Sequence, residues 1–131
     1  MKKIGLVLLT TVLVACGQNS TPQSKKQEQL ILGSWVIDKA DVNYGKKGGI
    51  ITYHEDGVMV YHGYKTAECK TLTTEVKGKW SINNNKLTIE IANDGQATTI
   101  VDDIISLESN TMTLKSSDGA TLYRAKSSSC L

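Results

Sequence analysis

The two histidines, His54 and His62, are the side chains best suited to bind a metal ion or relay a proton. A two-residue turn at Asp56-Gly57 would place them on opposite faces of one β-hairpin. Imidazoles that point apart cannot share an ion or a substrate. We therefore predict no metal site here and expect both histidines to be solvated.

Asp102 and Asp103 are the next candidates for acid–base chemistry, but they are adjacent in an expected strand. Their carboxylates would then face opposite sides, whereas a general acid and its base must share one site. We expect them instead to mark a bulge or bend of the strand. The chain also lacks a phosphate-binding loop, a Gly-x-Ser-x-Gly motif and a set of Cys and His at metal-ligand spacing. These features predict a protein that is not an enzyme and needs no cofactor.

The first fifteen residues have the organisation of a secretory signal. Lys2 and Lys3 precede an apolar run, Ile4 to Ala15, of twelve residues. A membrane span needs about 20 apolar residues, so this run fits the apolar region of a signal peptide better. Without Lys2 and Lys3 the basic residues fall from fifteen to thirteen, which equals the number of acidic residues. A mature chain near zero net charge, with no basic stripe, argues against a nucleic-acid partner.

The sequence Leu13-Val14-Ala15-Cys16 resembles the lipobox of bacterial lipoproteins. The resemblance implies cleavage before Cys16 and acylation of its thiol, so that the protein is anchored to a membrane of the cell envelope. Gly17 follows the cysteine, where an aspartate would resemble the inner-membrane retention signal. In a Gram-negative cell the resemblance therefore implies the periplasmic face of the outer membrane.

Residues 16–29 are polar, contain the one proline of the chain, and are expected to form a flexible tether with a reach of about 20 Å. A helix beginning within residues 25–29 is the alternative, although this stretch shows no clear apolar stripe. The tether would join the lipid to a single domain over residues 30–131.

From Leu30 onward, short runs of alternating apolar residues are separated by turn residues, which is typical of antiparallel β-structure. Each strand has one apolar face, so we predict an all-β, eight-stranded, up-and-down antiparallel barrel that buries this face and leaves no open edge. The expected strands lie near 33–42, 49–55, 58–64, 71–82, 86–92, 96–107, 111–116 and 120–126.

The opening sequence Leu-Gly-Ser-Trp, residues 32–35, resembles the Gly-x-Trp signature that begins the lipocalin barrel. The order of motifs over residues 30–126 is similar to the short lipocalin-like domain of many bacterial lipoproteins. The resemblance implies that Gly33 and Trp35 begin the floor of the barrel. It also implies that Arg124, in the last strand, packs over Trp35 and closes that floor.

Cys69 and Cys130 are an even pair in an expected exported protein, which suggests a disulfide. The lipocalin resemblance agrees, because many lipocalins tie the C-terminal tail to a strand in the middle of the barrel. Two free thiols in a reducing compartment are the alternative.

A lipocalin-like barrel implies a small hydrophobic ligand in the interior, and we expect the protein to be a monomer. The inward side chains predicted to contact this ligand are Tyr53, Val60, Trp80, Ile89 and Leu114. Trp80 could instead be a core residue without a ligand. The alternative function is an envelope module that binds or inhibits another protein through the loops at residues 43–49 and 64–70.

Overall fold

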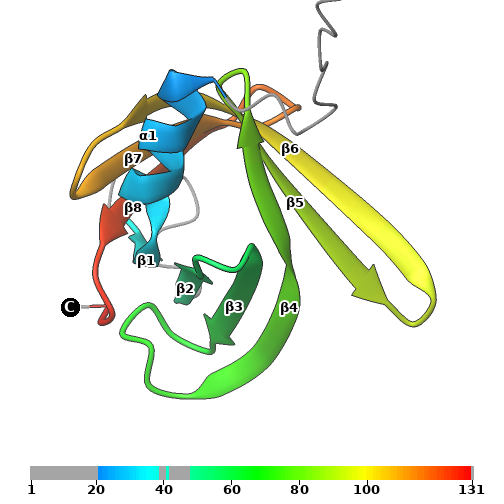
Figure 1. Ribbon diagram of the computed structural model, residues 1–131. Coiled ribbons are helices and arrows are strands. Elements are labelled where there is room, and N and C mark those ends of the chain that lie inside the picture. The colour runs from blue at the N-terminus through cyan, green and yellow to red at the C-terminus, as the bar shows by residue number, and fades with distance from the viewer. Residues whose placement is uncertain (1–20, 39–40, 42–47, 131) are drawn as a thin grey trace, which may run out of the picture.

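The computed structural model describes residues 21–38, 41 and 48–130, which fold into a helix packed on a β-barrel (Figure 1). The barrel is closed, and each strand is antiparallel to its neighbours in sequence, with β8 returning to pair with β1. This confirms the predicted eight-stranded up-and-down barrel. The elements are α1 (Pro22–Ile31), β1 (Gly33–Ile37), β2 (Gly49–Tyr53), β3 (Val58–Tyr64), β4 (Leu72–Asn83), β5 (Lys86–Asn93), β6 (Gln96–Leu107), β7 (Thr111–Lys115) and β8 (Thr121–Lys126).

Two of the tight turns follow directly from their residues. Asn84-Asn85 joins β4 to β5 and Asp94-Gly95 joins β5 to β6, and all four residues have positive φ. Two-residue turns with positive φ match the twist of antiparallel strands, and Asn, Asp and Gly adopt this conformation most readily. β1 is shorter than predicted, because it ends at Ile37.

The prediction of a flexible tether through Gln29 is wrong for residues 22–29, which belong to α1. Thr21 caps the helix, with its Oγ1 accepting a hydrogen bond from the Ser24 amide at 3.2 Å, and Pro22 occupies the first turn. Ile31 is fully buried in the barrel core. Tertiary packing at Ile31, rather than an apolar stripe along the helix, therefore accounts for α1.

The register of the β2–β3 hairpin differs by one residue from the prediction. Tyr53 pairs with Met59, and the His54 amide donates to the Val58 carbonyl at 2.9 Å, so the turn contains more than Asp56 and Gly57. A shift of one residue moves every following side chain to the other face of the sheet.

The core is a single cluster on the inner face of the barrel wall. Its side chains are at most 8 % exposed, and it draws on α1 and on seven of the strands, β1 to β7. The buried members are Ile31, Trp35, Tyr53, Met59, Ile82, Leu87, Ile89, Ile104, Met112 and Leu114.

The wall of the barrel parts between β4 and β5. β4 pairs with β3 from Leu72 to Lys79 but pairs with β5 only from Lys79 to Asn83. Beyond this point the β5–β6 hairpin extends away from the barrel, as Figure 1 shows. Gly78 lies at the point of divergence, where a Cβ atom would be 2.5 Å from the Glu90 carbonyl oxygen. Only glycine lets the two backbones approach this closely before they separate.

Candidate functional site

Trp35 joins α1 to the floor of the barrel. Its side chain is fully buried, and its indole Nε1 donates a 2.7 Å hydrogen bond to the Ile31 carbonyl. The ammonium of Lys126 lies 5.1 Å from the centroid of the indole ring and donates to the Leu30 carbonyl at 3.0 Å. The last turn of the helix is therefore held by side chains from both ends of the barrel sequence.

The prediction that Arg124 packs over Trp35 is wrong, because Lys126 occupies that place. Lys126 is the residue that pairs with Trp35 across β1 and β8, whereas Arg124 pairs with Ile37, two residues further along. Arg124 instead forms a 2.6 Å ion pair with Asp41, whose side chain is fully buried. The same carboxylate accepts a 3.1 Å hydrogen bond from the Tyr123 amide. A buried carboxylate requires such partners, so Arg124 closes the barrel against the segment after β1.

Three of the predicted ligand contacts belong to the packed core. Tyr53, Ile89 and Leu114 are 2 %, 6 % and 2 % exposed. Trp80 is half-buried, packs edge-on against Tyr53 with ring centroids 5.7 Å apart, and donates from its Nε1 to the His54 carbonyl at 2.9 Å. The fifth residue was assigned to the wrong face: Val60 pairs with Thr52 and points away from the core, as a consequence of the one-residue shift in the hairpin. These positions fill the barrel or lie outside it.

Asp102 is an acidic residue whose side chain points into the barrel. Asp102 is 6 % exposed and pairs with the buried Leu87, whereas Asp103 is exposed and forms a 2.6 Å ion pair with Lys86. The two carboxylates face opposite sides, as predicted. The predicted bulge at these residues is wrong, because both pair in regular register with β5 and the register shift in β6 lies between Ile104 and Ser106. Burial raises the pKa of Asp102 above its usual range, and the positive charge of Arg124 partly opposes this rise.

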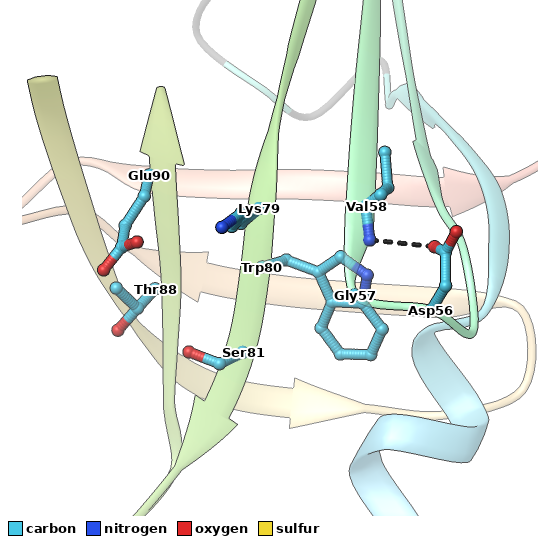
Figure 2. Close-up of a pocket in the computed structure, with 8 residues that line it drawn as sticks. All are labelled: Asp56, Gly57, Val58, Lys79, Trp80, Ser81, Thr88 and Glu90. Carbon is cyan, nitrogen blue, oxygen red and sulfur yellow. Dashed lines mark hydrogen bonds between the residues drawn. The ribbon is translucent and has the colours of Figure 1, made fainter. Parts of the chain in front are cut away.

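Two adjoining hollows lie where β4 and β5 meet and part. Figure 2 shows the first, beside the β2–β3 turn, with the Trp80 ring lying next to Gly57 and with Val58 donating from its amide to the Asp56 carboxylate at 3.0 Å. Its volume is about 380 Å³. The remaining lining residues are Lys79, Ser81, Thr88 and Glu90.

The second hollow, about 600 Å³, lies at the divergence of β4 and β5 and shares Val58, Lys79 and Glu90 with the first. We call it the seam hollow, and its other lining residues are Lys77, Gly78, Ile91, Ala92, Ala97 and Thr99. The lining is mainly apolar, with two lysines and one glutamate at its margin. An apolar hollow with a few charged groups fits a small ligand that has one polar end. The sequence analysis missed this site, because only the unequal pairing of β4 with its two neighbours creates it.

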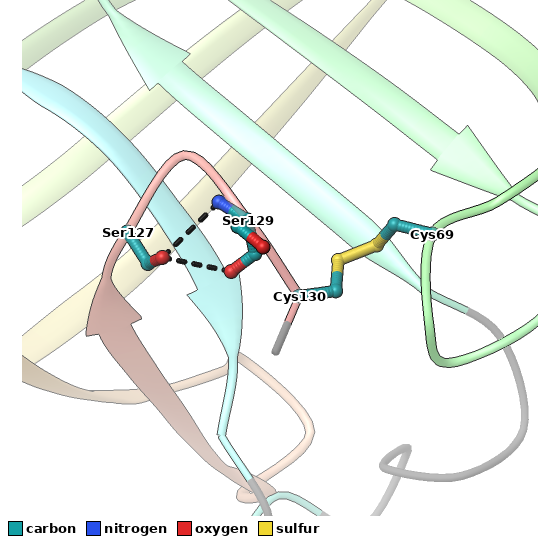
Figure 3. The surroundings of a disulfide bond; sticks show 4 residues. All are labelled: Cys69, Ser127, Ser129 and Cys130. Carbon is teal, nitrogen blue, oxygen red and sulfur yellow. Dashed lines mark hydrogen bonds between the residues drawn. A yellow bond between two sulfur atoms is a disulfide. The ribbon is translucent and has the colours of Figure 1, made fainter.

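Figure 3 shows the disulfide between Cys69 and Cys130, which agrees with the predicted pairing. The two Cα atoms are 5.7 Å apart, and 61 positions separate the cysteines in sequence. Cys69 has a positive φ of 55° and lies in the loop that packs on Gly48, where the Gly48 amide donates to the Thr66 carbonyl at 3.0 Å. The disulfide therefore fastens the C-terminal tail to the β3–β4 loop.

The predicted placement of the two histidines on opposite faces is wrong, because the one-residue shift in the hairpin puts His54 and His62 on the same face of the sheet. His62 Nε2 lies 2.9 Å from Glu75 Oε2 on the adjacent strand, and His54 is exposed in the β2–β3 turn. Among residues 21–38, 41 and 48–130, no group of three or more His, Cys, Asp or Glu side chains is arranged to hold a metal ion.

Comparison with protein families adds an independent result to this geometry. A family model described as a lipocalin-like domain matches residues 25–114. The chain belongs to this lipocalin-like family. No curated protein matches the sequence significantly. The match begins inside α1, so the family unit includes residues 25–29, which the sequence analysis had assigned to a tether.

The lipocalin-like domain is a fold consistent with binding a small hydrophobic ligand. Several predictions concern residues that the structure does not describe: the signal peptide, the acylated Cys16, the first part of the tether, and residues 43–47 of one candidate loop. No helix within the described part of the chain combines the length and apolar character needed to cross a bilayer.

Proposed function

We propose that this lipocalin-like protein binds a small hydrophobic ligand in the seam hollow, on the side of the barrel rather than in its centre. The observation that supports this placement is the parting of β4 and β5 at Gly78, which leaves Ile91, Ala92 and Ala97 beside an open volume of about 600 Å³. That volume lies within the range of typical small-molecule sites, about 300–1,000 Å³.

The inner wall of the barrel supports the same placement. The side chains that would line a central site are packed together, including Tyr53 against Trp80. A close-packed interior admits a ligand only if large side chains move, which is costly. A ligand in the seam hollow would displace only water.

Charge at the margin of the seam hollow suggests the polar end of the ligand. Lys77 and Lys79 are adjacent outward positions of β4, and both are exposed. Lys77 lies 3.8 Å from Glu75, a loose surface pair, and Glu90 is the one acidic side chain among the described residues that line the hollow. Two lysines against one glutamate favour a ligand with an apolar body and an anionic end.

Titration with a fluorescent probe would test this proposal. We expect the purified protein to bind cis-parinaric acid, an apolar chain with a terminal carboxylate. Replacing Ala92 with tryptophan fills the seam hollow and should weaken binding about tenfold or more, since each tenfold costs about 1.4 kcal/mol. Val101→Trp is the matched control, because Val101 is exposed on the same hairpin but lines neither hollow.

The lysines can be tested with the same probe. In the Lys77→Gln/Lys79→Gln variant the acid should bind more weakly, whereas its methyl ester should bind as it does to the unmodified protein. If the Ala92→Trp and Val101→Trp variants lose affinity for the probe equally, the ligand does not bind in the seam hollow. If the unmodified protein does not bind the probe at all, the proposal that it binds such a ligand is wrong.

We further propose that the domain is attached to a membrane of the cell envelope through lipid on Cys16. α1 begins at Pro22, so Cys16 and Thr21 are five residues apart. Covalent geometry limits that distance to about 18 Å. Anchored in this way, the domain would work close to the lipid surface, which can supply an apolar ligand with an anionic end.

Cell fractionation would test the anchor. The protein should appear in the membrane fraction and incorporate labelled palmitate, and the Cys16→Ser variant should lose the label. Incorporation of label by the Cys16→Ser variant at the level of the unmodified protein would contradict attachment at this residue.

A further inference from the structure

β6 has an unpaired edge over half of its length. It pairs with β5 from Gln96 to Asp103, but its ladder with β7 begins only at Asp103. In the described part of the chain, residues 96–102 thus have a sheet neighbour on one side only. Figure 1 shows why: this segment lies in the hairpin that extends beyond the barrel.

The alternation of the antiparallel ladder identifies the free backbone groups. The two residues that flank a two-residue turn form a hydrogen-bonded pair, so Gln96 turns its amide and carbonyl toward β5. Alternate residues then turn theirs away from β5, namely Ala97, Thr99 and Val101. By the same alternation Asp103 also turns its amide and carbonyl away from β5, and Asp103 is the residue at which β7 begins to pair with β6. The agreement at Asp103 supports the assignment.

The side chains along this edge offer no protection against pairing. Residues 96–101, Gln-Ala-Thr-Thr-Ile-Val, carry no charge and no proline, and all six are exposed. Ile100 and Val101 are 41 % and 39 % exposed. Natural proteins usually protect an exposed edge with charged residues, proline or a bulge, because a bare edge recruits another strand.

β4 provides the contrast within the same molecule. Its unpaired stretch, from Leu72 to Gly78, also has a neighbour on one side only, but it carries Glu75 and Lys77. Of these two stretches, only residues 96–101 of β6 therefore lack charged side chains.

We propose that β6 is a dimerisation edge, which pairs antiparallel with β6 of a second copy of this chain about a two-fold axis at Thr99. In this register Ala97 faces Val101 of the second copy, and Thr99 faces the second copy's Thr99. These are the residues whose backbone groups are free, so each pair can exchange two hydrogen bonds. The two copies would form one continuous sheet through their β5–β6 hairpins. The proposal replaces the monomer expected from the sequence.

A second copy is the partner that this edge fits best, because the arrangement is self-complementary. Small or β-branched side chains meet one another on one face, at the pairs of Ala97 with Val101 and of Thr99 with Thr99. On the other face Thr98 meets Ile100 and Gln96 meets Asp102 of the second copy. No two like charges are placed opposite each other.

A pair of double variants tests the register as well as the dimer. Ala97→Lys/Val101→Lys places lysine opposite lysine in both flanking pairs and should abolish the dimer. Ala97→Lys/Val101→Glu places lysine opposite glutamate in both pairs and should preserve it. The second variant is the matched control, because it contains the same lysine at position 97 and charges at both positions.

Native mass spectrometry of the full chain, released from detergent micelles over a series of protein concentrations, would give the readout. We expect the mass of two chains for the unmodified protein and for the lysine–glutamate variant, and the mass of one chain for the lysine–lysine variant. Amide hydrogen exchange should also be slowed at Ala97, Thr99 and Val101 in the dimer and fast in the lysine–lysine variant. A single-chain mass for the unmodified protein at every concentration would overturn the proposal. A two-chain mass that persists in the lysine–lysine variant would also overturn it.

Discussion

Replacing Trp35 with alanine is expected to lower the free energy of unfolding by about 3–5 kcal/mol, as for other buried aromatic residues. The indole is fully buried, so its removal leaves a cavity against Ile31. The variant also loses the hydrogen bond from the indole Nε1 to the Ile31 carbonyl, which holds the last turn of α1. Denaturant unfolding followed by circular dichroism would measure the loss. Digestion with a protease that cleaves at Lys25 and Lys26 should become faster as α1 detaches.

Lys126→Met is the companion variant for this experiment. It removes the cation beside the indole ring and the hydrogen bond to the Leu30 carbonyl, but it leaves the core filled. The cation–π contact is worth about 0.5–2 kcal/mol, so the expected loss is smaller than for Trp35→Ala. If Trp35→Ala unfolds at the same denaturant concentration as the unmodified protein, the indole does not hold the helix to the barrel.

Replacing Cys69 with serine is expected to lower the free energy of unfolding by about 4 kcal/mol under oxidising conditions. The disulfide closes a segment of 61 positions, and the chain-entropy model gives this magnitude for a loop of that size. The effect matters for a small barrel, since a domain of this size buries a limited apolar core. Thermal and denaturant unfolding, each with and without reductant, would measure it.

Cys130→Ser provides the control for the disulfide, because either substitution removes the same bond. The two variants should be equally stable, and the double variant should be no less stable than either one. With reductant present, the unmodified protein should unfold like the variants. Identical unfolding of the unmodified protein and the Cys69→Ser variant without reductant would show that the bond does not contribute.

The strands could be predicted from the sequence because the turns between them depend on the residues of the turns themselves. Asn84-Asn85 and Asp94-Gly95 favour tight turns by their own conformational preferences, and the apolar alternation between them requires one buried face. Eight such strands in succession leave closure as the simplest way to bury that face. The closed barrel can therefore be predicted largely from turn residues and from apolar alternation within short segments.

The register of the β2–β3 hairpin could not be obtained in the same way. Asp56-Gly57 suggested a two-residue turn, but the Gly57 amide donates to the His54 carbonyl and the Asp56 carboxylate accepts from the Val58 amide. These contacts make a wider turn. The packing of Tyr53 and Met59 in the core selects that register over the narrower one, and local residue preference does not report such packing.

Pairing between strands far apart in the sequence also determines which residues meet at the barrel floor and where the seam hollow forms. Arg124 and Lys126 lie on the same face of β8, and the pairing of β8 with β1 determines which of them meets Trp35. The seam hollow depends on where β4 leaves β5, which is a property of three strands together. Neither feature has a signature within a single segment.

The attachment of α1 to the barrel affects how the domain responds to a pull on its N-terminal side. Tension applied before Pro22 reaches the contacts of Ile31 and Leu30 with Trp35 and Lys126 before it reaches the strand pairs of β1. The contacts that hold the helix would therefore break before the strand pairs of the barrel do. The sheet would then keep its strand pairing while the point of attachment moves.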